Sequence, residues 1–173
     1  MKVVLVAATP AEHAIGTPGA ATRDFAFSSY NYAIGLLKAC TESDPVARCR
    51  VDIALADLPV SRARDALSAS QLAEILSLDP QVVGLSCYCW SLDVLLDAAT
   101  SLKQARPGLI VLAGGPSVSF DPIGVLERAR AVDIVVRGEG EDAFVELCRL
   151  AWRGANRAQR AQLRRLVVER LAR

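Results

Sequence analysis

Short apolar segments recur along the chain and are separated by stretches in which apolar residues follow helical spacing. Four of these segments run without the alternation of a half-exposed strand, which predicts strands buried on both faces, as in a parallel sheet. A fifth segment alternates Val51, Ile53 and Leu55 with less apolar residues, so we expect an edge strand that ends at Leu58-Pro59. The four buried segments are 2–8, 82–86, 109–113 and 132–136.

Helices are predicted between the strands from periodic apolar residues and from start and stop signals. Ser91 is expected to be the N-cap of a helix that ends before Arg106-Pro107-Gly108, and Ser28 or Ser29 can cap the first helix. Asp79-Pro80 is expected to end the second helix. The five predicted helices run through 32–39, 67–78, 92–105, 125–129 and 143–151.

This alternation of strands and helices predicts an α/β fold with right-handed crossovers and helices on both faces of the sheet. We expect a Rossmann-like (flavodoxin-like) three-layer αβα domain with a five-stranded parallel sheet of order 2-1-3-4-5. Ligands of such folds bind beyond the carboxyl ends of the strands, at the point where the strand order reverses. The domain is predicted to span 1–153, followed by a basic amphipathic helix or linker over 154–173.

Composition limits the class of protein. A length of 173 residues with 52% hydrophobic content is enough for one domain with a sizeable core. The sequence holds no apolar segment of membrane-spanning length and no secretory signal, so we expect a cytoplasmic protein. Its five cysteines are odd in number, which favours reduced thiols over disulfides. Cys87 and Cys89 form a close pair, but no further metal ligands follow at a recognisable spacing.

Charge is distributed unevenly. The chain has a net charge of +1, yet its residues 149–173 contain eight arginines and one acidic residue, so this segment carries +7 and the remainder −6. A basic tail is compatible with nucleic acid, a membrane surface or a partner protein. Trp152 is its one aromatic residue, where nucleic-acid binding would need aromatic or polar readers, and it lacks the bulky anchors of a membrane helix, so we expect a docking helix or a linker.

Three unusual segments follow strands and should lie on one edge of the sheet: 86–91 (Ser-Cys-Tyr-Cys-Trp-Ser), Gly114-Gly115-Pro116 and Gly138-Glu139-Gly140. Glycine there lets a flat or bulky ligand approach the backbone. Neither glycine segment fits a dinucleotide-binding or P-loop pattern, and each alone is explained by a tight turn or a strand end. Together, beside the long loop 9–27, they predict a site for a large organic cofactor.

The segments Val83–Ser91, Ala113–Pro116 and Asp133–Glu141 resemble the N-terminal cobalamin-binding domain of cobalamin-dependent radical SAM enzymes, over about Lys2 to Leu150. The resemblance implies a corrin over the carboxyl edge of the sheet, with its benzimidazole tail inserted beside the central strand in the base-off form. Ser86 would then face the tail, and Gly114 and Gly115 would make room for it. The implied cofactor-binding residues are Thr9, Pro10, Ser86, Cys87, Tyr88, Trp90, Gly114, Gly115, Pro116, Gly138, Glu139 and Gly140.

The sequence departs from that family in lacking the C-x-x-x-C-x-x-C motif of the radical SAM iron–sulfur cluster. It is therefore expected to be an excised domain, a separate subunit or a free-standing cobalamin carrier. Such a module would be non-catalytic alone and would present its corrinoid for methyl transfer or radical SAM chemistry carried out by another domain or subunit.

His13 is the single histidine. Cobalamin domains of the methionine synthase type carry D-x-H-x-x-G here, and their histidine binds cobalt from below. This chain keeps H-x-x-G but has Ala11 in place of the aspartate, which removes the residue that would orient the imidazole. His13 is thus a candidate lower cobalt ligand, and a solvated loop histidine is the alternative.

The sequence is also compatible with two other functions. The first is a cobalamin-dependent sensor, which would use the basic segment as its output. The second is a flavodoxin-like regulatory domain that binds no cobalamin. A receiver domain of that type needs an acidic cluster after the first strand and an aspartate after the third, whereas Ala7, Ala8 and Ser86 stand at these positions.

Overall fold

The computed structural model describes residues 1–10, 32–60 and 66–150. His13, the serines expected to cap the first helix and the predicted basic segment 154–173 lie outside the described residues. Of the helices in the described part of the chain, none combines the length and the apolar character needed to cross a bilayer.

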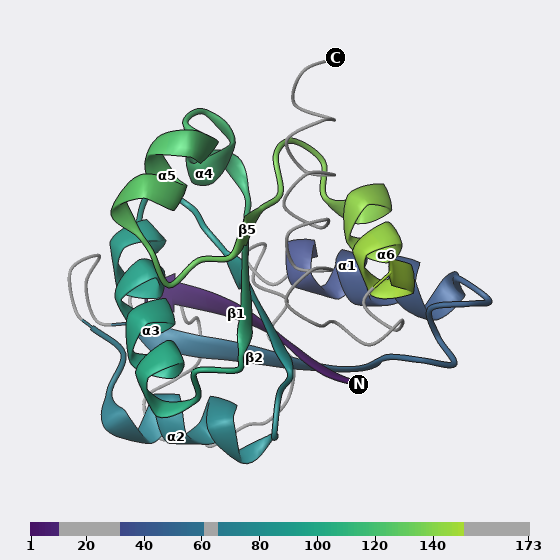
Figure 1. The fold of residues 1–173 in the computed structure, drawn as a ribbon, viewed down its shortest axis with the longest axis horizontal. Helices are drawn as coiled ribbons and strands as arrows, with labels where there is room; N and C mark the ends of the chain where they lie inside the picture. The colour runs from purple at the N-terminus through teal and green to yellow at the C-terminus, as the bar shows by residue number, and fades with distance from the viewer. Residues whose placement is uncertain (11–31, 61–65, 151–173) are drawn as a thin grey trace.

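The sheet has the predicted topology. Its five strands are all parallel and lie in the order β2-β1-β3-β4-β5, so the strand order reverses between β1 and β3 (Figure 1). The strands are β1 (Lys2–Pro10), β2 (Asp52–Val60), β3 (Val82–Ser86), β4 (Ile110–Gly114) and β5 (Ile134–Val135). The α/β class and the strand order are therefore confirmed.

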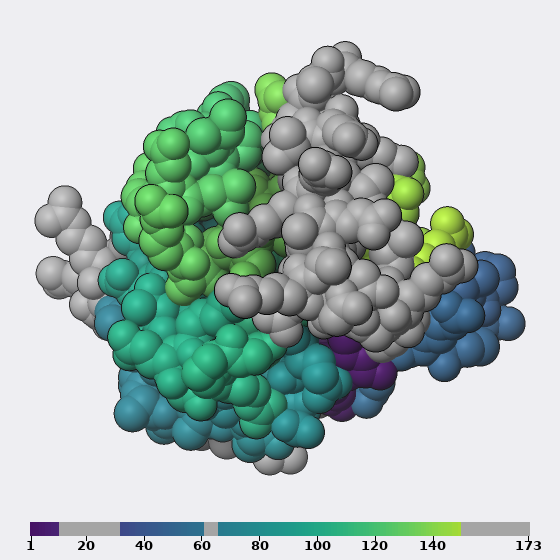
Figure 2. All heavy atoms as spheres, viewed as in Figure 1, coloured from purple at the N-terminus to yellow at the C-terminus, as the bar shows by residue number. Residues whose placement is uncertain are grey.

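Helices cover both faces of the sheet, as the continuous apolar strands require. On one side lie α2 (Ala69–Ser77), α3 (Leu92–Ala105), α4 (Pro116–Ser119) and α5 (Pro122–Arg128). On the other lie α1 (Tyr32–Ser43) and α6 (Glu141–Leu150). In the space-filling view the atoms of α4 and α5 form one green lobe above the teal atoms of α3 (Figure 2).

Alternate residues of each central strand enter different cores. In β3, Val83 and Leu85 pack under α3, whereas Val82 points toward α1 and α6. Gly84 and Ser86 share the face of Val82 because side chains alternate along a strand. This face therefore loses apolar volume toward the carboxyl end of β3, where Gly84 and Ser86 replace larger side chains.

The second strand was predicted to end at Leu58-Pro59, and this boundary is wrong. β2 continues to Val60 and pairs with β1 over its whole length, from Lys2 opposite Asp52 to Pro10 opposite Val60. Pro59 is tolerated because β2 is an edge strand, as predicted, so the missing N–H disrupts no second ladder. Leu55 is 39% exposed, in agreement with that edge position.

The region between β4 and α6 also differs in detail. One short helix was expected before the fifth strand, but two are present, since α4 begins directly after Gly115 with Pro116 in its first turn. Strand β5 contains two residues instead of the predicted five. After Val136, whose N–H still bonds to the Ala113 carbonyl, the backbone leaves the sheet, and Gly138 in the turn that follows has a positive φ of 74°.

Candidate functional site

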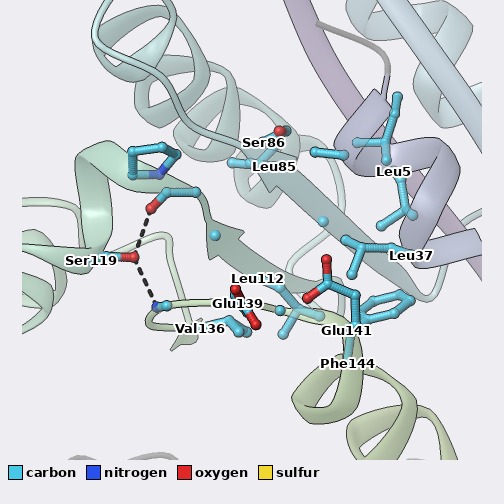
Figure 3. A pocket seen from close by; sticks show the side chains of 18 of the residues that line it. Leu5, Leu37, Leu85, Ser86, Leu112, Ser119, Val136, Glu139, Glu141 and Phe144 are labelled. Atoms are coloured by element: carbon cyan, nitrogen blue, oxygen red, sulfur yellow. Dashed lines mark hydrogen bonds between the residues drawn. The ribbon is translucent and has the colours of Figure 1, made fainter. Parts of the chain in front are cut away.

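A pocket of about 420 Å³ opens at the carboxyl edge of the sheet and extends between the sheet and the pair α1 and α6. Its floor is formed by side chains of β1, β3 and β4, and its opposite wall by α1 and Phe144 of α6 (Figure 3). Apolar side chains line its inner part: Leu5, Ile34, Leu37, Leu112, Val136 and Phe144.

Small residues on the sheet create this space. Gly84 and Gly114 both line the pocket from adjacent central strands. A Cβ on Gly84 would lie 2.6 Å from Cδ2 of Leu5, so any larger residue would push Leu5 toward the cavity. A Cβ on Gly114 would make an ordinary van der Waals contact with Cβ of Val136 at 3.8 Å, so it could be accommodated but would take up room in the pocket. The pocket therefore depends on the absence of side chains at these two positions.

The ends of β3 and β4 are held together at the mouth. The Cys87 N–H donates to the Gly114 carbonyl at 2.7 Å, and the Ser117 N–H donates to the Cys87 carbonyl at 3.3 Å. Gly115 has a φ of 106°, and a Cβ there would lie 2.6 Å from the Cys87 oxygen. This close approach permits only glycine, and it leaves bare backbone along the pocket edge.

The turn from β3 into α3 is organised by Ser91, which is fully buried. Its hydroxyl accepts the Tyr88 N–H at 3.1 Å and lies 3.4 Å from the carbonyls of Ser86 and Tyr88. Ser91 occupies the N-cap position, but its side chain makes no capping hydrogen bond, because it closes this turn instead. The turn presents Tyr88 to the pocket, where its ring stacks on Trp90 at a centroid distance of 4.7 Å.

Polar groups are few and lie at the mouth. Ser86 is 9% exposed, and its hydroxyl has no hydrogen-bond partner among the residues that the structure describes. The side chains of Glu139 and Glu141 line the opposite side (Figure 3). An apolar slot with bare backbone and a few acceptors at its opening suits a bulky organic group with a polar periphery.

The family model for the B12 binding domain matches residues 26–148. The chain belongs to the B12-binding domain family. Its cofactor is thus cobalamin, and the family match accords with the Rossmann-like sheet and with a ligand site at the carboxyl edge.

Three curated relatives are informative. A 2-(S-pantetheinyl)-carbapenam-3-carboxylate methyltransferase of Streptantibioticus cattleyicolor is 45% identical over 69 residues, 40% of this chain and 10% of that protein. The cobalamin-dependent radical SAM methyltransferase TokK of Streptomyces tokunonensis is 40% identical over 70 residues, with the same shares. An anaerobic magnesium-protoporphyrin IX monomethyl ester cyclase of Cereibacter sphaeroides is 33% identical over 84 residues, 48% and 14% of the two chains.

The matched stretches are thus a small part of each relative, and the resemblance to the cobalamin domain of radical SAM enzymes is confirmed at the level of the domain. Within the described parts of the chain, no group of three or more His, Cys, Asp and Glu side chains is placed to hold a metal ion.

The B12-binding domain brings most of the predicted cofactor residues to one pocket. Those that line it are Ser86, Tyr88, Gly114, Gly115, Pro116, Gly138, Glu139 and Gly140. Their role in binding remains a prediction. His13, the predicted cobalt ligand, falls outside the described residues.

Four predicted residues do not line the pocket. Thr9 donates its hydroxyl to Asp57 at 2.6 Å, and Pro10 ends β1. Cys87 lies in the core beneath α3, where burial raises the pKa of its thiol to about 12, so it remains protonated at neutral pH. Trp90 contacts the site through its stacking on Tyr88.

The apolar lining and Ser119 were not among the residues predicted from the sequence. Gly84 could have been found, because it lies two residues before Ser86 and must share its face of the strand. Leu37 and Phe144 carried no such signal, because α1 and α6 are separated by about a hundred residues and pack against each other only in the folded chain.

Proposed function

We propose that this B12-binding domain holds cobalamin in the base-off form and presents the corrinoid to a methyltransferase or radical SAM catalytic unit on another domain or subunit. The observation that carries the proposal is the glycine-walled pocket beneath the carboxyl edge of the sheet. A corrin resting on that edge would have a channel below it for the nucleotide tail.

The residues of the pocket fit such a cofactor. Gly84 and Gly114 would leave room for a flat aromatic base against the sheet, and Leu5, Leu112 and Phe144 would enclose it with apolar surface. The Ser86 hydroxyl would donate to or accept from the buried tail. The carboxylates of Glu139 and Glu141 would accept hydrogen bonds from amide groups on the corrin periphery.

The bound cobalamin would supply the methyl-transfer chemistry at cobalt, and the domain would bind and orient it. Two of the relatives are named as methyltransferases, which supports a methyltransferase context. Since the sequence lacks the C-x-x-x-C-x-x-C motif, we propose that a radical SAM domain or subunit is its partner. A reducing, cytoplasmic setting is in keeping with the five unpaired cysteines.

The direct test is titration of the purified protein with hydroxocobalamin, followed by desalting and a visible spectrum. Retention with the base-off spectrum is the expected result. Loss of the corrinoid on desalting would overturn the proposed function, and a base-on spectrum would overturn the insertion of the nucleotide tail.

The lower cobalt ligand has its own test. Electron paramagnetic resonance of the Co(II) form reports a nitrogen ligand as a superhyperfine splitting. If His13 binds cobalt, the splitting will be present in the parent protein and absent in His13→Ala. A parent spectrum without nitrogen splitting would show that His13 leaves the cobalt free.

A further inference from the structure

Ser119 connects two glycine turns that both line the pocket. Its hydroxyl donates to the Gly115 carbonyl at 2.8 Å and accepts the Gly138 N–H at 3.0 Å (Figure 3). Gly115 belongs to the turn after β4, and Gly138 to the turn after β5. One side chain therefore bridges the two strand ends at the pocket mouth.

The geometry of α4 orients this hydroxyl. Ser119 lies four residues after Gly115, so its donation to the Gly115 carbonyl is a bond within the first helical turn. Because the hydroxyl proton of Ser119 points to the Gly115 carbonyl, a lone pair of the Ser119 Oγ is free to accept the Gly138 N–H. Thr at this position could make both bonds, whereas Ala could make neither.

The β4–β5 ladder does not continue to this level. The two strands pair only at Leu112 with Ile134 and at Ala113 with Val135, and the Val136 N–H then donates to the Ala113 carbonyl at 2.8 Å. Beyond Val136, in the described part of the chain, the bond from Gly138 to Ser119 is the hydrogen bond that joins the 137–139 turn to α4. The side chain thus replaces backbone pairing where the strands separate.

We propose that Ser119 is a positioning residue that sets the gap between the Gly114–Pro116 wall and the Gly138–Gly140 wall, and thereby the fit of the nucleotide tail. Both walls line the pocket, as does Ser119 itself. The inference rests on the proposed function, because it concerns the same cofactor site. It adds a residue that acts by holding two turns in place and not by the bulk of its side chain.

The experiment compares two corrinoids on three variants. Ser119→Ala should weaken the binding of hydroxocobalamin about tenfold, because binding must then order the two turns that Ser119 holds in place in the free parent protein. Its affinity for cobinamide, which lacks the nucleotide tail, should stay within twofold of the parent. Ser119→Thr should restore cobalamin affinity. The matched control is Ser117→Ala in the same helix, whose main-chain N–H, and not its hydroxyl, contacts Cys87.

Three results would overturn the inference: an unchanged cobalamin affinity in Ser119→Ala, an equal loss for both corrinoids, or a failure of Thr to restore binding. A parent protein that retains neither corrinoid would instead overturn the proposed function itself. Amide hydrogen exchange of the parent provides a test that needs no variant. The Gly138 amide should be protected in the free protein, and rapid exchange there would also overturn the inference.

Discussion

At the residue scale, the site is defined by positions where a side chain is missing. Gly84 lies opposite Leu5 in the β1–β3 register, and the Leu5 side chain already extends over it. Gly114 lines the pocket from β4, where a Cβ would contact Val136 at 3.8 Å without a clash. Gly115 is different, since both its φ of 106° and its contact with Cys87 exclude a side chain. Two glycines therefore provide volume, and one provides a turn.

Gly84→Val tests the volume. Its branched side chain would displace Leu5 into the pocket, so cobalamin affinity should fall more than tenfold while the protein remains folded. Equilibrium titration together with far-ultraviolet circular dichroism measures both properties. The control is Gly35→Ala on α1, where a Cβ meets no atom within 4 Å. It should keep its affinity and gain about 0.5–1 kcal/mol of stability. Undiminished affinity in Gly84→Val would contradict the role given to this position.

At the element scale, ion pairs join segments that the sheet alone holds weakly. Strand β5 has only two paired residues, but Asp133, directly before it, accepts the Val111 N–H at 2.8 Å and lies 2.6 Å from the Lys103 ammonium group. Lys103 also donates to the Leu109 carbonyl at 2.5 Å. The side chains of Lys103 and Asp133 are only 19% and 23% exposed. This network attaches β5 to both β4 and α3.

Replacing Asp133 should therefore destabilise the whole fold. Asp133→Ala removes a charged acceptor from the Val111 N–H and leaves Lys103 without its carboxylate, which should cost about 2 kcal/mol in the free energy of unfolding. Urea denaturation measures this difference. Asp52→Ala removes the comparable pair with Lys2, but the Asp52 side chain is 72% exposed, so its effect should be smaller. Equal losses in the two variants would contradict the structural role of Asp133.

A second pair joins the turn after α1 to the end of α6. The pKa of Asp44 lies well below its usual value of 3.8. The largest cause is the hydrogen bond from the Arg149 guanidinium, and the second is the hydrogen bond from the Ala47 N–H. The Asp44 side chain is 8% exposed. Because α1 and α6 carry the apolar wall of the pocket, the pair between Asp44 and Arg149 helps to hold that wall in place.

The pKa of Asp44 predicts a dependence of stability on pH. A carboxylate whose pKa is lower in the folded than in the unfolded state stabilises the folded protein at pH values above its unfolded pKa, near 4. This stabilisation is lost as the pH falls toward the pKa of the folded state. Between pH 4 and pH 2 the parent should lose stability faster than Asp44→Asn, which cannot titrate. Urea denaturation at several pH values measures the slopes. Parallel slopes would show that the pair contributes nothing to acid sensitivity.

At the scale of the whole molecule, the pocket lies between the sheet and the α1–α6 layer. It is bounded by segments from both ends of the described chain, such as β1 and α6. A ligand bound there contacts elements that are distant in sequence. Binding should therefore stabilise the folded state as a unit, because a pocket of this kind does not exist in the unfolded chain.

Hydroxocobalamin at a hundred times its dissociation constant should raise the free energy of unfolding by about 2.7 kcal/mol. For a domain of this size the melting temperature should increase by roughly 5–10 °C. Differential scanning calorimetry with and without the cofactor measures the shift. Gly84→Val, measured at the same cofactor concentration, is the control and should show a much smaller increase. An unshifted parent would contradict binding in this pocket.

Local patterns in the chain were enough to predict the class of fold, the strand order and the edge of the sheet where most of the predicted cofactor residues meet. These follow from local patterns: apolar runs in 2–8 and 82–86, the polar alternation of 51–56, and glycines directly after strands. The resemblance of three ordered motifs was sufficient to identify cobalamin. A capping box at Ser68 and Gln71 was also present as a local pattern and was overlooked.

The shape of the site, in contrast, depends on contacts between segments that are distant in the sequence. Pro59 can lie within a strand because one edge of that strand is unpaired. Ser91 closes a turn because the carbonyls of Ser86 and Tyr88 point toward its hydroxyl. The bridge made by Ser119 joins residues whose separation in space is set by the divergence of β4 and β5. Such contacts arise from packing between distant segments, and no periodicity in one segment encodes them.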